Sequence, residues 1–258
     1  MKQKISIYTS LGTGTLEERL NAIRNASFDA VCLDFEAEML SGEGSWQQQI
    51  SLAEKYALEV ETVHLTGDGM TDVWSEGEKG EFVTQRLIGE LKELKAVGVS
   101  SGVCHVTWGH DKPHAPDRIG LNRFLRIAEA AEKYNVCLAV ENSVYSDYPA
   151  YIFDNIDSKN IGFCYDSGHE NAFTPDFDYL SKYGDRMIAM HLHDNNGRED
   201  AHAIPFSGTI NWSEKVEKLK KTRLWQSFIT LECHIRQNKS LDEDLEYIYG
   251  VAKRLGQM

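Results

Sequence analysis

Short apolar runs alternate with longer amphipathic stretches along the whole chain. The runs are rich in β-branched residues and too short for buried helices, so they predict strands. The stretches between them repeat apolar residues at helical spacing, and Thr15-Leu16-Glu17-Glu18 reads as a capping box at the start of the first one. The predicted strands are 5–8, 30–35, 59–65, 102–107, 136–141, 161–165, 187–192 and 227–232. The predicted helices are 15–24, 46–56, 81–97, 117–134, 177–183, 213–221 and 241–255.

The alternation of strands with helices is typical of a parallel sheet whose outer face is covered by helices. The chain has 258 residues, and a single (β/α)8 barrel runs to about 250 residues. We therefore predict an α/β fold, a TIM barrel formed by one domain over residues 1–258. A doubly wound sheet would alternate in the same way, but this chain has no glycine-rich phosphate turn after its first strand. Between the fifth and sixth strands, 147–160 is short and predicts only a stub of helix.

Successive strand runs from the fourth onward end on or near a residue that can bind a metal ion. These residues are His105, Glu141, Asp166, His191 and Glu232. In a barrel of parallel strands the carboxyl ends converge on one rim, so residues far apart in the sequence would meet in one site. Any one of these acids could instead form a salt bridge on the rim, but a salt bridge does not explain why several strands in succession end in this way. The pattern predicts a metalloenzyme.

Glu141, Asp166, His191 and Glu232 are the predicted ligands of one divalent metal ion. Carboxylate oxygens combined with imidazole suit Mn, Zn, Co or Fe better than Ca. Three carboxylates and one imidazole would leave coordination positions open for a substrate to chelate. An open position is typical of catalytic rather than structural metal sites.

The composition narrows the class of partner. The 40 Asp and Glu residues outweigh 27 Lys and Arg residues, and the formal net charge is -13. Such a surface repels nucleic-acid backbones and anionic membranes, so neither partner is expected. The N-terminus lacks the apolar core of a signal peptide, and no apolar stretch approaches the roughly 20 residues that span a bilayer. We expect a cytoplasmic protein whose five cysteines, an odd number without a CxxC pair, are reduced.

Several short blocks stand at the predicted strand ends and in the loop after the seventh strand. They are Val63-His64-Leu65, Val140-Glu141-Asn142, Asp166-Ser167-Gly168-His169, His191-Leu192-His193-Asp194, His202-Ala203-Ile204-Pro205, Gly208-Thr209-Ile210-Asn211-Trp212 and Thr230-Leu231-Glu232. In order and spacing they resemble the xylose-isomerase-like TIM-barrel superfamily, which contains sugar isomerases and epimerases and the endonuclease IV type of apurinic endonuclease. The resemblance covers essentially the whole chain. One departure is Phe206, which stands where the family commonly has glycine.

The resemblance implies roles for individual residues. In the sugar-epimerase branch the four predicted ligands hold one metal ion, and the two glutamates, Glu141 and Glu232, are also the proton-transfer pair. His169 would contact sugar oxygens, and Arg198 is a loose counterpart of an arginine that follows the histidine of the seventh strand. The implied reaction is isomerisation or epimerisation of a small sugar or polyol-derived molecule next to a carbonyl group. Relatives are often dimers or tetramers, so a homo-oligomer stays open.

Other residues near the strand ends would line the same mouth. His64 and His105 end the third and fourth strands, and contacts to substrate hydroxyls are favoured over a second metal ion. Trp108 would provide an apolar wall for the C–H face of a sugar, although helix packing is the competing role. Glu36, near the end of the second strand, would accept a hydrogen bond from a substrate hydroxyl or form a rim ion pair.

Two alternative activities stay open within the same architecture. Some members of the superfamily are lyases that dehydrate a keto-inositol or dehydroshikimate, and the first proton abstraction is shared with the isomerases. Endonuclease IV relatives instead bind several zinc ions and cleave abasic DNA. The positions of their additional ligands are filled here by His64, His105, His169, Asp200 and His202. The acidic composition weighs against this activity, because a protein that grips a duplex needs a face rich in Lys and Arg.

Overall fold

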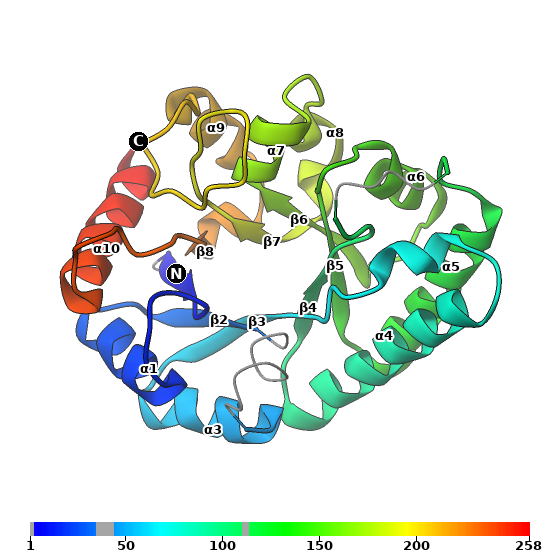
Figure 1. Ribbon diagram of the computed structural model, residues 1–258, viewed down its shortest axis with the longest axis horizontal. Helices are drawn as coiled ribbons and strands as arrows, with labels where there is room; N and C mark the ends of the chain where they lie inside the picture. The colour runs from blue at the N-terminus through cyan, green and yellow to red at the C-terminus, as the bar shows by residue number, and fades with distance from the viewer. Residues whose placement is uncertain (1–2, 35–43, 110–113) are drawn as a thin grey trace.

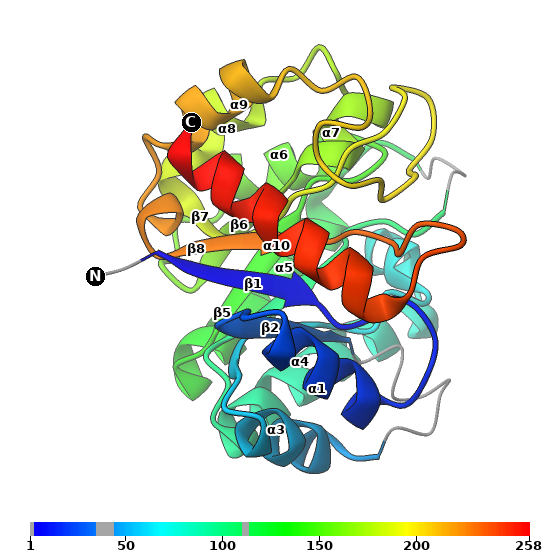
Figure 2. The ribbon, with the colours of Figure 1, turned by 90° about the vertical axis from the view of Figure 1, so that its left-hand side faces the viewer.

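The computed structural model describes residues 3–34, 44–109 and 114–258. In Figure 1 the strands surround the centre of the molecule and the helices lie outside them; Figure 2 shows α10 lying across β1 and β8. The strands are β1 (Lys4–Tyr8), β2 (Ala30–Asp34), β3 (Glu59–His64), β4 (Ser101–Cys104), β5 (Cys137–Glu141), β6 (Ile161–Asp166), β7 (Met187–His191) and β8 (Phe228–Leu231). The helices are α1 (Leu16–Asn25), α3 (Trp46–Lys55), α4 (Glu78–Val97), α5 (Arg118–Tyr134), α6 (Asp147–Asn155), α7 (Ser167–Phe173), α8 (Tyr179–Tyr183), α9 (Trp212–Leu219) and α10 (Leu241–Gln257). Three short 3₁₀ helices are η1 (Met70–Trp74), η2 (Gly184–Arg186) and η3 (Leu224–Gln226).

The parallel strands close into a barrel. The sheet runs in the order β7-β6-β5-β4-β3-β2-β1-β8, and each paired strand is parallel to its neighbour. The two ends of this sheet meet, because the Leu192 N–H donates to the Thr230 carbonyl at 3.0 Å and the Glu232 N–H donates to the Leu192 carbonyl at 3.2 Å. The predicted TIM barrel is confirmed. Its closure places the carboxyl ends of β5 to β8 side by side on one rim.

Some predicted elements differ from those observed. β4 ends at Cys104, so His105 lies just beyond the strand, and 147–160 contains the nine-residue helix α6 rather than a stub. The helix predicted over 177–183 is only the short α8, and α7 follows β6 directly. α7 spans seven residues, too few to show a clear apolar repeat in the sequence. The Asp166 carboxylate caps α7 by accepting a hydrogen bond from the His169 N–H at 2.6 Å.

Two apolar layers hold the barrel together. Val103, Ala139, Cys164 and Ala189 form a small inner cluster, and a much larger cluster packs the strands against the helices. Cys104 belongs to the outer cluster, so the two cysteines lie on opposite faces of the sheet, as strand alternation predicts. All five cysteines are free thiols. None of the helices in the described ranges is long and apolar enough to cross a bilayer.

The loop between β7 and α9 carries Asp200 and His202 to the barrel mouth, and the fully buried carboxylate of Asp194 anchors this loop. This carboxylate accepts hydrogen bonds from the backbone N–H groups of Asn195 (2.9 Å), Phe206 (3.1 Å) and Ile210 (3.2 Å) and from the Trp212 indole (2.8 Å). The backbone of Asp194 also pairs with that of Ala203 in both directions. Residues on both sides of the loop are thereby tied to one buried side chain.

Phe206 adopts a left-handed backbone conformation, with φ of 73°. Such a φ is unusual for a bulky residue, whereas glycine adopts it without steric strain. The glycine that is common in the family at this position is consistent with this backbone conformation. The ring is held by its neighbours. The Arg254 guanidinium lies 3.8 Å from the ring centroid, and the Trp212 ring lies 5.9 Å away.

Asp194→Asn should lower the free energy of unfolding by about 1–3 kcal/mol, because an amide nitrogen would face N–H groups that now donate to a carboxylate oxygen. Urea denaturation measures this loss. Asp178→Asn is the matched control, since Asp178 caps the start of α8, asparagine caps helices equally well, and the surface ion pair of Asp178 with Lys218 contributes about 0–1 kcal/mol. A loss of the same size in both variants would show that Asp194 is not an anchor.

Candidate metal centre

The four predicted metal ligands lie together at the carboxyl end of the barrel. Glu141 ends β5, Asp166 ends β6, His191 ends β7, and Glu232 directly follows β8. One donor atom from each lies within 4.8 Å of all the others. All four side chains are buried. The closed barrel therefore assembles three carboxylates and an imidazole in one small volume.

His191 lies between two of the carboxylates. Its Nδ1 is 3.2 Å from Glu141 Oε1 and 3.0 Å from Glu232 Oε2. Glu232 Oε2 and His191 Nε2 nevertheless have no hydrogen-bond partner among the described residues. A buried carboxylate oxygen that makes no hydrogen bond is costly, so this oxygen fits a bound cation. The donor set is one that Mn, Zn, Co or Fe accepts.

A second group surrounds the other oxygen of Glu141. His64 Nε2 and His105 Nε2 each lie 3.2 Å from Glu141 Oε2. His64 Nδ1 lies 3.1 Å from the Leu65 carbonyl oxygen, which can only accept, so Nδ1 carries a proton. In the neutral imidazole, Nε2 then turns a lone pair toward the carboxylate. This contact is favourable only with a cation, either a proton or a metal ion, between the two atoms.

A third group forms where the loop after β7 reaches the barrel. Asp200 Oδ2 lies 3.2 Å from His169 Nε2 and 3.0 Å from His202 Nε2. Each of these imidazoles has its Nδ1 beside a backbone carbonyl, that of Asn142 at 2.9 Å and that of Glu232 at 3.1 Å. Both neutral rings would therefore turn a lone pair toward the same carboxylate oxygen. A cation is again needed to balance the contact.

His193 connects the third group to the four predicted ligands. Its Nε2 lies 2.9 Å from Asp166 Oδ2 and 3.7 Å from Asp200 Oδ1. The His193 ring also stacks on the His202 ring, with centroids 4.1 Å apart and planes at 6°. His193, Asp200 and His202 have donor atoms within 4.8 Å of one another. The histidines and acids thus form one continuous cluster.

The electrostatics of this cluster favour the charged forms. Burial would raise the pKa of Glu141, but the charges of His191 and His105 and the hydrogen bonds from His105 and His169 hold that pKa well below its ordinary value. Burial opposes charge on His202 as well, yet Asp200 and Glu232 raise its pKa to about 9. The pKa values of His169 and His191 are likewise raised, so in the absence of metal, protons on these three imidazoles would balance the carboxylates. Metal binding would release those protons.

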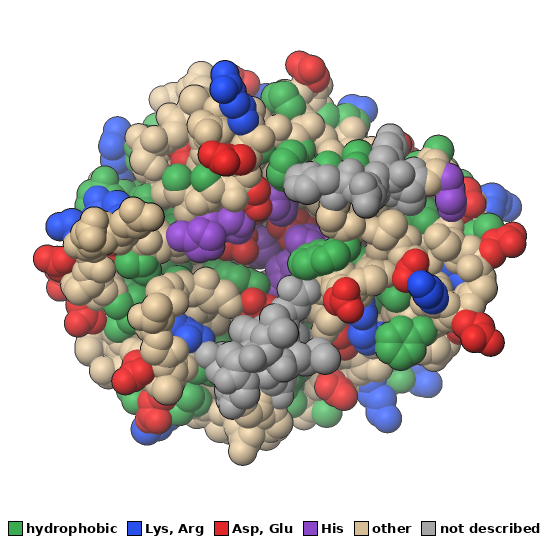
Figure 3. All heavy atoms as spheres, in the orientation of Figure 1, with side chains coloured by type: hydrophobic (Ala, Val, Ile, Leu, Met, Phe, Trp, Pro, Cys, Tyr) green, Lys and Arg blue, Asp and Glu red, His purple; other side chains and the backbone are tan. Residues whose placement is uncertain are grey.

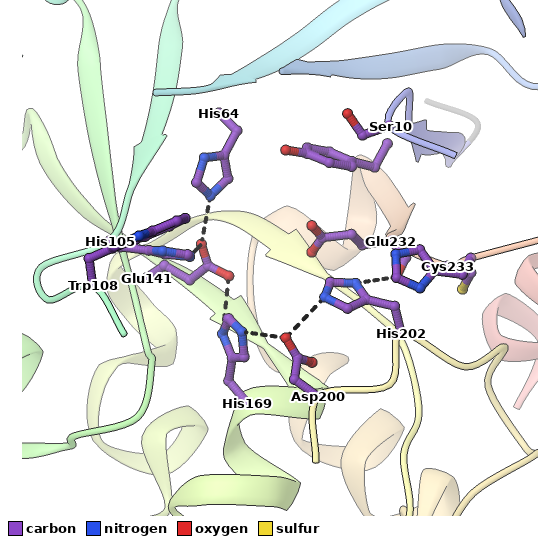
Figure 4. A pocket seen from close by; sticks show the side chains of 12 residues that line it. Ser10, His64, His105, Trp108, Glu141, His169, Asp200, His202, Glu232 and Cys233 are labelled. Atoms are coloured by element: carbon purple, nitrogen blue, oxygen red, sulfur yellow. Dashed lines mark hydrogen bonds and ion pairs between the residues drawn. The ribbon is translucent and has the colours of Figure 1, made fainter. Parts of the chain in front are cut away.

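A cavity of about 290 Å³ opens onto the cluster. In Figure 3 most of the histidine side chains on this face gather in a hollow at its centre, and Figure 4 shows Glu141, from the end of β5, and Glu232, just after β8, pointing into the cavity. Tyr8, Ser10, Trp108, Cys233 and His234 complete its lining.

The residues predicted to contact substrate have different positions. The three histidines among them line the cavity, and Trp108, 42% exposed, forms part of its wall. Arg198 is exposed and is not among the lining residues; its backbone N–H donates to Asn196 Oδ1 at 2.9 Å. Glu36 lies outside the described residues.

Tyr8 and Ser10 were not predicted from the sequence as site residues. Tyr8 ends β1, so the convergence of strand ends on one rim also predicts a place for it at the barrel mouth. Tyrosine is not one of the residue types from which the metal ligands were predicted. Burial raises the pKa of Tyr8 well above its ordinary value, and the charges of Asp34 and Glu232 add to this effect. The Tyr8 hydroxyl is therefore a hydrogen-bond donor at every physiological pH.

Comparison with known proteins identifies relatives of this chain. A family model described as "Xylose isomerase-like TIM barrel" matches residues 20–251. The chain is 37% identical over 95 residues to the uncharacterized protein y4fM of Sinorhizobium fredii and 35% identical over 106 residues to the uncharacterized protein MJ1311 of Methanocaldococcus jannaschii. The matches cover 34% and 37% of this chain and 30% and 36% of the two relatives. The similarity thus spans about a third of the length of each relative.

Solved structures share the fold over nearly the whole chain. A D-tagatose 3-epimerase-like protein has a TM-score of 0.76 at 20% identity, covering 99% of this chain and 98% of that one. The IOLI protein with a bound zinc atom has a TM-score of 0.75 at 16% identity, covering 98% and 96%. The 3-keto-D-glucoside 4-epimerase YcjR from E. coli has a TM-score of 0.74 at 17% identity, covering 98% and 100%. At these identities the likeness shows a common fold and no more.

Addition of Mn, Co or Zn to metal-free protein should raise its thermal unfolding temperature. A ligand at 100 times its Kd stabilises the folded state by about 2.7 kcal/mol. Glu232→Gln should shrink this metal-dependent rise, because a neutral amide replaces a carboxylate donor. Glu90→Gln is the control, since Glu90 is a buried acid paired with Arg86 outside the cluster. Equal rises in the two variants would count against a metal at Glu232.

Proposed function

Since the chain belongs to the xylose isomerase-like TIM barrel family, we propose that it is a divalent-metal-dependent sugar isomerase or epimerase. The proposed reaction moves a proton at a carbon next to a carbonyl group. The observation that carries the proposal is the group Glu141, Asp166, His191 and Glu232, whose donor atoms lie within 4.8 Å of one another beside a cavity of about 290 Å³. Small-molecule sites start at about 300 Å³, so this cavity suits a small substrate.

The four side chains would hold a divalent ion that acts as a Lewis acid on neighbouring substrate oxygens and stabilises the negative charge that develops when the proton leaves. The chain's own residues supply the base and orient the substrate. His64, His105 and His169 line the cavity beside Glu141 and are placed to bind substrate hydroxyls. The Tyr8 hydroxyl, kept protonated, is a further donor on the same cavity.

Glu232 and Glu141 are the proposed proton-transfer pair. The Glu232 side chain is 12% exposed and that of Glu141 only 1%, so Glu232 is the more open to a bound substrate and is assigned as the base that removes the proton. Delivery of a different proton, carried by Glu141, to the other face of the same carbon gives an epimer; it leaves Glu232 protonated and Glu141 ionised, and solvent exchange restores the starting states. Return of the removed proton by Glu232 to the neighbouring carbon gives an isomer. General acid–base transfer of this kind contributes about 10²–10⁴-fold to the rate.

The names of similar structures support the class of reaction. One is a D-tagatose 3-epimerase-like protein, another a 3-keto-D-glucoside 4-epimerase, and the IOLI structure holds zinc. Sugar substrates and metal sites therefore both occur among proteins of this fold. With identities of 16% to 20%, they support the proposal at the level of the class and leave the particular sugar open.

A second candidate function is phosphodiester cleavage by several metal ions. It is favoured by the two additional donor groups, one formed by His64, His105 and Glu141 and the other by His193, Asp200 and His202. It is opposed by the charge of -13 and by the lack of Lys or Arg among the described residues that line the cavity. We expect no incision of an abasic duplex by the zinc-loaded protein. Efficient incision with two or three zinc ions per chain would make this candidate the better one.

Glu232→Gln should lower turnover at least about 100-fold, because an amide cannot accept the substrate proton. The direct measurement uses NMR to monitor the incorporation of deuterium from D₂O at the carbon next to the carbonyl group. Ketoses and keto-inositols are tested as candidate substrates. Wild-type protein should exchange this position in its substrate, and Glu232→Gln should not. Unchanged circular dichroism of the variant is the folding control. Exchange at the wild-type rate in Glu232→Gln would exclude Glu232 as the base.

A further inference from the structure

A second cavity, of about 330 Å³, adjoins the one at the metal ligands. His105, Trp108, His169 and Asp200 line both cavities and form their common wall. The remainder of its lining comes from Thr107, Gly109, Ser143, Val144 and Phe173. None of these five residues belongs to the groups of candidate metal ligands. A molecule held at the metal ligands can therefore extend past the common wall into this second cavity.

Two aromatic rings line the second cavity, each beside a histidine of the common wall. The Trp108 ring lies 5.4 Å from the His105 ring at 31°, and the Phe173 ring lies 5.9 Å from the His169 ring at 35°. The backbone of Trp108 is fixed by Thr71, whose hydroxyl accepts from the Trp108 N–H at 2.8 Å and donates to the Trp108 carbonyl at 3.1 Å. The tryptophan is thus held at the cavity, although its ring is half-exposed. Aromatic faces of this kind provide apolar area against which the C–H face of a sugar ring can pack.

The polar groups that belong to the second cavity alone are uncharged. Thr107 Oγ1 and Ser143 Oγ lie 3.4 Å apart and can donate to or accept from a ligand hydroxyl. No Lys or Arg is among the described residues that line the cavity, and Asp200 brings a negative charge to its wall. The two imidazoles of the common wall are already paired with carboxylates, His105 with Glu141 and His169 with Asp200, each at 3.2 Å, so a phosphate or carboxylate group would find no unpaired cation there. The lining suits a neutral ring that carries hydroxyl groups.

We propose that the second cavity is a subsite for a second sugar ring, and that the substrate is an uncharged glycoside or disaccharide with its reacting ring at the metal ligands. The inference rests on the proposed function for the chemistry at the reacting ring. Binding of the second ring does not require turnover, so it can be measured separately.

The test is calorimetric binding of glucitol and of a glucosyl-glucitol, neither of which has a carbonyl group to react, to the metal-loaded protein. Wild-type protein should bind the glucosyl-glucitol at least about tenfold more tightly, the gain that one well-packed ring gives. Phe173→Ala should remove most of this gain and change glucitol affinity less than about twofold. Phe177→Ala is the matched control, because Phe177 is another half-buried aromatic, packs 4.4 Å from Tyr179 and does not line the cavity. It should retain the gain.

Equal affinity of wild-type protein for the two probes would overturn the subsite, as would an equal loss in the Phe173 and Phe177 variants. Tighter binding of a nucleoside than of the glucosyl-glucitol would overturn it too, in favour of a base-stacking site. The two proposals fail in different ways. If glucosyl-glucitol binds more tightly than glucitol in a way that depends on Phe173, but no keto sugar or keto-glycoside is turned over, the subsite is supported and the isomerase activity is contradicted. If free ketoses are turned over but glucosyl-glucitol binds no more tightly than glucitol, the isomerase activity is supported and the subsite is contradicted.

Discussion

The acids at the barrel mouth share a buried volume with imidazoles that are oriented to face them, and only cations can balance this arrangement. His64, His169 and His202 each direct Nδ1 to a backbone carbonyl and Nε2 to a carboxylate oxygen. Protons can serve as the cations, and the raised pKa of His202 indicates that they do so when no metal is bound. A divalent ion would satisfy the same lone pairs with more charge and a fixed geometry. The proposed activity follows from this constraint, because an ion held in a cavity has positions left for a substrate.

The rest of the fold keeps these atoms in place. Closure of the barrel between β7 and β8 sets His191 beside Glu232. Asp166 caps α7 through the His169 N–H, so the same carboxylate that contacts His193 also fixes the start of the helix that carries His169. Asp194 ties down the loop that carries Asp200 and His202. Several candidate ligands, such as Asp166, His169 and His202, are therefore held by backbone groups of elements other than their own, and the site depends on the whole barrel.

Much of the fold and the centre of the site could be predicted from the sequence, because both depend on local rules. Strand runs alternate with helical stretches, and the parallel barrel brings strand ends together, so Glu141, Asp166, His191 and Glu232 could be grouped before any coordinates. The parts that could not be predicted depend on long-range contacts. The sequence offered Trp108 two roles, a cavity wall or helix packing, and the contact with Thr71 that holds it at the cavity is long-range. α7 is too short for a periodic signal. Arg198 was predicted to contact substrate only because its position corresponds approximately to that of an arginine in the family. In this structure Arg198 is exposed. Tyr8 was overlooked because its residue type is not a metal ligand.

The proposed function requires a divalent ion in the group formed by Glu141, Asp166, His191 and Glu232. Crystals of metal-loaded protein, measured on both sides of the absorption edge of the added metal, would locate that ion. An anomalous peak is expected among these four side chains, with donor distances near 2.0–2.2 Å if the metal is zinc. Metal-loaded crystals with anomalous peaks only elsewhere, or with His191 Nδ1 still 3.0 Å from Glu232 Oε2 and no ion between them, would contradict the proposed function.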